Sequence, residues 1–165
     1  MRDRLWSPWR LQYVTGAKSD RCPFCDALSL PDDESLIVHQ GTSAYVMLNR
    51  YPYNNGHVLV VPFRHHATLV GLLPEELFDI GNLTQMSEAA LRLAYEPQGI
   101  NVGINLGRTA GAGIADHLHV HLVPRWGGDT HFMTVIGETR VLPEAIGETA
   151  RRVRTAFLAV AREAQ

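Results

Sequence analysis

Several short stretches of the chain are apolar or alternate between apolar and polar residues, which predicts β-strands. They are rich in β-branched residues and are bounded by turn residues such as the Gly41-Thr42 and Asn54-Asn55-Gly56 segments. The predicted strands are Leu36–His39, Ala44–Leu48, His57–Pro62, Ile100–Leu106 and a histidine-rich strand within Asp116–Arg125. The first two form a hairpin.

Two longer segments have helical periodicity instead. From Pro74 to about Tyr95 apolar residues recur every three or four positions, and the proline and glutamates at its start suit a helix N-terminus. A second amphipathic segment begins at Pro143 and ends near Arg162. The order hairpin, strand, helix, strand, strand, helix favours an α+β fold with an antiparallel sheet.

The chain length fits one domain with short extensions, because 165 residues can bury a single substantial core. Residues 1–20 are basic and aromatic and are interpreted as an N-terminal arm. The main domain is placed at residues 21–135. Residues 136–165 are a linker and helix that belong to the same unit.

Composition excludes several classes of partner. A net charge of −2 argues against binding to nucleic acid, which requires a clustered basic face. No apolar run approaches the ~20 residues that span a bilayer, so no membrane contact is expected. The first residues lack the apolar stretch of a secretory signal, and a cytoplasmic location is therefore expected.

Three histidines occupy alternate positions in the run His117-Leu-His119-Val-His121. In a β-strand they share one face, with neighbours ~6–7 Å apart along the strand. A shared metal ion is one interpretation and a chance surface row is another. Because neutral imidazole is a base and a nucleophile near pH 7, the row also suits phosphoryl chemistry, in which one ring attacks phosphorus and a neighbour protonates the leaving oxygen.

The two cysteines stand in a Cys22-Pro-Phe-Cys25 motif, a spacing that occurs in structural zinc sites. Two further ligands are needed, and a closed site with one of His65 or His66 and one end of the histidine row is reasonable. A redox dithiol or two unpaired thiols are the alternatives.

The segment from Asn105 to Gly113 is a loop with glycines at 107, 111 and 113. Glycines let backbone N–H groups approach an anion, and Asn105, Arg108 and Thr109 add donors. Beside three histidines, the loop is interpreted as an anion cradle.

The run from His117 to Val123 resembles the signature of the histidine triad (HIT) superfamily. The similarity extends through Asn49, the Gly56–Pro62 segment and the Asn105-Leu-Gly107 segment, and continues to the Pro-Arg-Trp-Gly-Gly-Asp segment that ends at residue 129. The Trp-Ser-Pro-Trp-Arg start and that final segment are most similar to the bacterial diadenosine tetraphosphate (Ap4A) phosphorylase-like branch.

The resemblance implies a HIT-like fold, with a five-stranded antiparallel sheet, a long helix and a C-terminal helix, usually in a homodimer. It implies that His119 attacks the α-phosphorus, that His121 binds the transferred phosphate and assists the leaving oxygen, and that His117 orients the segment. In zinc-bearing members His117 also joins Cys22, Cys25 and a histidine that falls on His65. The substrate-binding residues it implies are Asn49 at the ribose, with His57, Asn105, Gly107, Thr109, Gly111 and Gly113 at or near the phosphates.

The expected activity is that of a nucleotidyl transferase or hydrolase that cleaves a dinucleoside polyphosphate through a nucleotidyl-histidine. A water-using HIT hydrolase or purine nucleoside phosphoramidase is the alternative within the same fold. A non-catalytic, zinc-stabilised nucleotide-binding adaptor is the alternative from another class. Neither phosphate nor water is identified as the acceptor by these residues.

Overall fold

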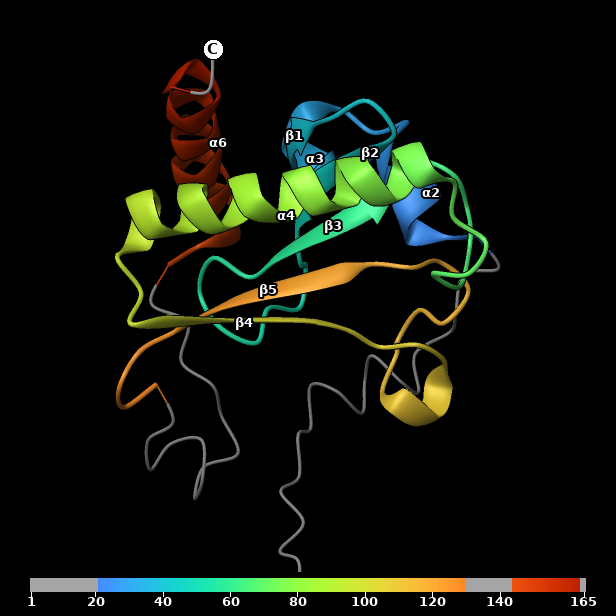
Figure 1. The fold of residues 1–165 in the computed structure, drawn as a ribbon. Coiled ribbons are helices and arrows are strands. Elements are labelled where there is room, and N and C mark those ends of the chain that lie inside the picture. The colour runs from blue at the N-terminus through green and yellow to red at the C-terminus, as the bar shows by residue number, and fades with distance from the viewer. Residues whose placement is uncertain (1–20, 130–143, 164–165) are drawn as a thin grey trace, which may run out of the picture.

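A five-stranded antiparallel sheet forms the centre of the molecule in the computed structural model, which describes residues 21–129 and 144–163 (Figure 1). The strands lie in the order β1-β2-β3-β5-β4. Their bounds are Ile37–Gln40 for β1, Ala44–Leu48 for β2, Val58–Pro62 for β3, Gly99–Ile104 for β4 and Val120–Arg125 for β5. The predicted α+β fold and antiparallel sheet are confirmed. The predicted N-terminal arm lies outside the described residues.

The helices are α2 at Pro23–Ala27, α3 at Asp32–Ser35, α4 at Pro74–Tyr95 and α6 at Ile146–Glu163, with a 3₁₀ turn at Arg108–Ala110. The long helix α4 crosses the sheet and contacts β2, β3 and β5 (Figure 1). Helix α6 packs against α4 and β1. The bounds predicted for α4 are confirmed, whereas α2 and α3 were not predicted from the sequence.

The core lies around the two central strands β2 and β3, in which every residue is buried. Both faces of a central strand are covered, so these strands read as continuous apolar runs. Tyr45 of β2 donates its hydroxyl to the carbonyl oxygen of Phe24 at 2.7 Å, which ties the short helix α2 to the sheet. None of the described helices has the length and apolar character needed to cross a membrane.

The sequence predicted one strand that contains all three histidines, and this prediction is wrong for His117 and His119. Strand β5 begins at Val120, which pairs with Val60 of β3. The next opposing pair would be Val61 and His119, and it is not part of the ladder. The backbone N–H of Leu118 donates instead to the carbonyl oxygen of His66 at 2.7 Å, beyond the end of β3, and the His117 imidazole donates to the carbonyl oxygen of Pro62 at 2.9 Å. His117 and His119 therefore precede the strand.

Candidate functional site

The hydrogen bond of His119 leaves one of its ring nitrogens free to react. Its Nδ1 lies 2.9 Å from the carbonyl oxygen of His117. A carbonyl only accepts, so Nδ1 carries the proton and the lone pair of the neutral ring is on Nε2. The side chain is buried, with 6% of the residue exposed, and burial lowers the pKa of His119. The imidazole is therefore held neutral, in the tautomer that can attack with Nε2.

A second chain of hydrogen bonds fixes the tautomer of His121. The backbone N–H of Tyr53 donates to Nδ1 of His57 at 3.0 Å, so the proton of neutral His57 is on Nε2. That Nε2 lies 3.0 Å from Nδ1 of His121 and donates to it. The proton of neutral His121 is consequently on Nε2.

This Nε2–H group of His121 is buried and has no hydrogen-bond partner in the part of the chain that the structure describes. A buried donor without a partner is costly, and in a native fold it points to a ligand or a catalytic role. Burial, together with the neighbouring His119, lowers the pKa of His121 to about 4. The centroids of the two rings are 4.8 Å apart, so a nucleophilic nitrogen and a proton donor lie side by side.

The imidazole of His117 contacts a different group of residues. Its Nε2–H donates to the carbonyl oxygen of Pro62, which leaves the lone pair on Nδ1. Nδ1 lies 3.3 Å from the Cys22 sulfur and 3.6 Å from the Cys25 sulfur. The Cys25 sulfur lies 3.4 Å from Nδ1 of His65.

One ligand atom from each of these four residues lies within 4.8 Å of the others, so the four residues could hold a metal ion. Two thiolates and two imidazoles suit a tetrahedral ion such as zinc. His66 stands apart, because its Nε2 lies 3.3 Å from the Thr68 hydroxyl instead. Of these two neighbouring histidines, His65 is therefore the one that lies beside the cysteines.

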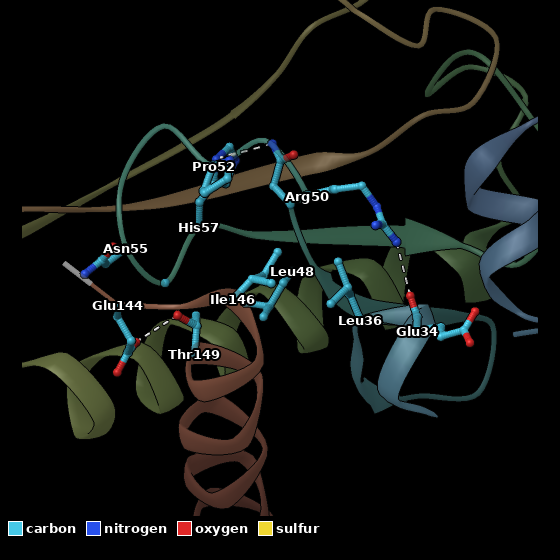
Figure 2. A pocket seen from close by; sticks show the side chains of 12 residues that line it. Glu34, Leu36, Leu48, Arg50, Pro52, Asn55, His57, Glu144, Ile146 and Thr149 are labelled. Atoms are coloured by element: carbon cyan, nitrogen blue, oxygen red, sulfur yellow. Dashed lines mark hydrogen bonds between the residues drawn. The ribbon is translucent and has the colours of Figure 1, made fainter. Parts of the chain in front are cut away.

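A pocket of about 430 Å³ adjoins the histidines at Asn49 and His57. Figure 2 shows Leu36, Leu48 and Ile146 in the middle of its lining, with the Glu144–Thr149 pair at one end and the Arg50–Glu34 pair at the other. The amide nitrogen of Asn49 lies 3.3 Å from Nδ1 of His57. An apolar centre with polar ends suits a nucleoside, which has a flat base and a hydroxylated sugar.

The glycine-rich loop lies elsewhere. Asn105, Gly107, Thr109, Gly111 and Gly113 connect β4 to the histidine segment, and none of them lines this pocket. Gly107 and Gly111 have φ values of +84° and +96°, a conformation that favours glycine. The sequence did not indicate the contribution of α6 to the pocket.

Phe24 was also missed, although its position inside the Cys-Pro-Phe-Cys motif could have drawn attention to it. Its ring centroid lies 4.9 Å from that of His119 and 5.5 Å from that of His117. Tyr53 was missed for a different reason, because its contribution to the hydrogen-bond chain is a backbone N–H.

Comparison with known proteins agrees with this geometry. A family model of the HIT domain matches residues 31–128. The chain is 41% identical over 161 residues to an AP-4-A phosphorylase of Mycobacterium tuberculosis, covering 92% of this chain and 83% of the relative. A Zn-bound histidine triad family protein from Mycobacterium smegmatis matches with a TM-score of 0.69 at 26% identity, over 87% of this chain and 97% of that one. A hypothetical histidine triad nucleotide-binding protein from Sulfolobus tokodaii has the same fold, with a TM-score of 0.70 at 24% identity over 86% of this chain and 95% of that one.

Proposed function

The chain belongs to the HIT domain family, and on this premise we propose that it cleaves Ap4A through a covalent nucleotidyl-His119 intermediate. The observation that carries the proposal is the pairing of two neutral imidazoles, the buried ring of His119 and the half-buried ring of His121, in complementary tautomers. Nδ1–H of His119 is bonded to a carbonyl, so Nε2 can attack. Nδ1 of His121 accepts from His57, so its Nε2–H can donate. A binding module needs no such pairing. The named activity of the M. tuberculosis relative supports Ap4A as the substrate.

The reaction proceeds in two displacements. Nε2 of His119 attacks the α-phosphorus and forms a P–N bond, while the bond from that phosphorus to the bridging oxygen breaks. The Nε2–H of His121 donates a hydrogen bond to the leaving oxygen and stabilises its developing negative charge, and ATP departs as an anion. Inorganic phosphate then attacks the same phosphorus with one oxygen, His119 leaves with its lone pair, and the proton of the phosphate stays on the new terminal phosphoryl group. The product of this second step is ADP.

The pocket beside His57 is proposed as the nucleoside site. Asn49 is proposed to bind the ribose, and its contact with His57 supports a position near the histidines. Asn105, Gly107, Thr109, Gly111 and Gly113 are proposed to hold phosphates, because their loop leads directly into the histidine segment. Backbone N–H groups in such a loop favour anions.

We propose zinc for the Cys22, Cys25, His65 and His117 cluster. The donor set and the free lone pair on Nδ1 of His117 support this assignment. When bound, the ion contributes folding free energy and holds α2 against the histidine segment. It takes no part in the displacements, because the lone pair of His117 faces the cysteines.

A homodimer is the proposed assembly. The two edge strands of the sheet differ, since β1 is in contact with α6 whereas β4 is largely exposed. Val102 of β4 is 52% exposed and Leu106 is 45% exposed. An uncovered edge strand offers backbone donors and acceptors to a second copy. Sedimentation equilibrium of the wild type and a Val102→Lys variant tests this assembly.

The activity is tested by incubating the protein with Ap4A in the presence and absence of inorganic phosphate and identifying the products. We expect ATP and ADP only when phosphate is present. ATP and AMP, or ADP alone, without phosphate would show that water is the acceptor. No cleavage under either condition would contradict the proposal and favour a phosphoramidase or a binding protein.

A further inference from the structure

We propose that Phe24 is a positioning residue that holds the imidazole of His119 in its attacking orientation. The inference rests on the proposed function, in which His119 is the nucleophile. The carbonyl of His117 fixes one nitrogen of the His119 ring, but a single hydrogen bond leaves the ring able to tilt about it. Among the residues that the structure describes, two other rings lie against it. His121 is one, at 4.8 Å between centroids, and Phe24 is the other, at 4.9 Å.

Of these two neighbours, His121 donates a hydrogen bond to the leaving oxygen of the substrate in the proposed reaction. Phe24 has no such task, and its ring is chemically inert. It is buried, with 4% exposed, and its plane is inclined by 54° to that of His119. The edge of the same ring meets His117 at an interplanar angle of 85°. Phe24 therefore packs against both the nucleophile and the residue whose carbonyl orients the nucleophile.

The backbone of Phe24 is fixed from two sides. Its carbonyl oxygen accepts the hydroxyl of Tyr45, which is fully buried in β2. The residues on either side of the Pro-Phe pair, Cys22 and Cys25, place their sulfur atoms 3.3 and 3.6 Å from Nδ1 of His117. The one-turn helix α2 thus cannot shift without breaking contacts to the sheet and to the histidine segment. A positioning side chain requires a backbone that is held rigidly in this way, because a displacement of the reacting groups by about 1 Å can lower the rate about 100-fold.

The fold contains a matched control. Phe157 of α6 is also buried, with 1% exposed, and its ring also stacks on a histidine, His39, at 5.0 Å. His39 belongs to β1 and does not line the pocket. The substitutions Phe24→Leu and Phe157→Leu therefore remove the same atoms from equally buried positions, each beside an imidazole. Only the first of those imidazoles is the nucleophile.

The test measures formation of the nucleotidyl-enzyme in a single turnover. Enzyme in excess is mixed with α-³²P-labelled Ap4A without phosphate and stopped with alkali, in which a P–N bond to histidine survives. The dependence of the rate on enzyme concentration separates the chemical rate constant from substrate affinity. Thermal melts and zinc content are measured on every variant.

For Phe24→Leu we expect the chemical rate constant to fall about 10–100-fold, with substrate affinity changed less than about threefold. Phe157→Leu is expected to lower the melting temperature and leave the rate constant within about twofold of wild type. If Phe24→Leu does not fold, Phe24→Met replaces it, because methionine fills similar volume without a flat ring. An unchanged rate constant in the Phe24 variant that folds, or an equal loss in Phe157→Leu, overturns the inference. A wild-type protein that forms no nucleotidyl-enzyme refutes the proposed function, and this inference falls with it.

Discussion

Replacing His57 by alanine removes the donor that sets the tautomer of His121. In the native site the backbone of Tyr53 fixes the proton of His57 on Nε2, and that proton is donated to Nδ1 of His121 over 3.0 Å. In His57→Ala the Nδ1 atom of His121 loses this partner. The neutral ring can then carry its proton on either nitrogen. In one of these two forms Nε2 has no N–H with which to donate a hydrogen bond to the leaving oxygen.

The size of the effect follows from the cost of an unpaired buried group. Leaving a buried acceptor unsatisfied costs about 1–3 kcal/mol. A change of 1.4 kcal/mol corresponds to about tenfold in rate. Removing one hydrogen-bond donor to a developing negative charge costs about 10²–10³-fold in kcat. We therefore expect kcat with Ap4A to fall about 10–100-fold in His57→Ala.

The assay compares two leaving groups. Ap4A releases a phosphate oxygen whose developing charge is stabilised by a hydrogen bond, whereas the 2,4-dinitrophenyl ester of AMP releases a much less basic phenolate that needs little stabilisation. We expect the loss in His57→Ala to shrink to less than about threefold with the ester, because the proton of His121 no longer matters. His57→Gln retains an N–H donor and should recover part of the activity on Ap4A. His39→Ala serves as the control, since it removes an imidazole outside the site. Equal losses with both substrates, or equal activity of the Gln and Ala variants, would refute the tautomer argument.

Four further outcomes are expected. His119→Ala should lose at least about 10³-fold in turnover while still binding AMP by calorimetry, and retained turnover would exclude the covalent route. Metal analysis should find about one zinc per chain, and Cys22→Ser should lower both zinc content and melting temperature. Asp79→Ala should reduce the free energy of unfolding in urea by about 2–4 kcal/mol without changing kcat, because one carboxylate oxygen accepts from the backbone of Ser43 and Ala44 at 2.6 and 2.9 Å. Finally, kcat/KM should stay level as the pH falls from about 8 through about 6.5, the ordinary pKa of histidine, and decrease only at lower pH, because burial lowers the pKa of His119 and protonation removes its attacking lone pair. A midpoint near 6.5 would contradict this.

Much of the fold was predictable because its signals are local. Helix α4 begins at Pro74, where Glu76 accepts the backbone N–H of Leu73 at 2.8 Å, as the acidic first turn had indicated. Strands β2 and β3 are buried on both faces, and their apolar runs were correspondingly clear. The starting residue of β5 was not predictable from its own sequence. It depends on residues distant in sequence, because the backbone N–H of Leu118 donates to the carbonyl oxygen of His66 and the ladder with β3 begins only at Val120.

The candidate site was predictable in its residue types and less so in its geometry. The spacing of Cys22 and Cys25 identified them as candidate metal ligands. The choice between His65 and His66 as a further ligand depends on how the chain orients two adjacent side chains. The pocket wall from α6 is formed by residues about a hundred positions away from Asn49 in sequence, and no local pattern reports such a contact. Phe24 looked like part of the metal motif, and only the fold places its ring against His119.

The different roles proposed for the three histidines follow from their hydrogen-bond partners and not from their spacing in the sequence. Each imidazole has one nitrogen engaged, and the engaged nitrogen determines what the other can do. His117 donates from Nε2 to a carbonyl and keeps a lone pair for the cysteine cluster. His119 donates from Nδ1 to a carbonyl and keeps a lone pair for phosphorus. His121 instead accepts at Nδ1 and keeps a proton. A substrate with one attackable phosphorus and one leaving oxygen requires a lone pair and a proton side by side, and the second and third rings supply that pair. The first ring is joined to them through its own backbone carbonyl, so the residue that completes the proposed metal site also orients the proposed nucleophile.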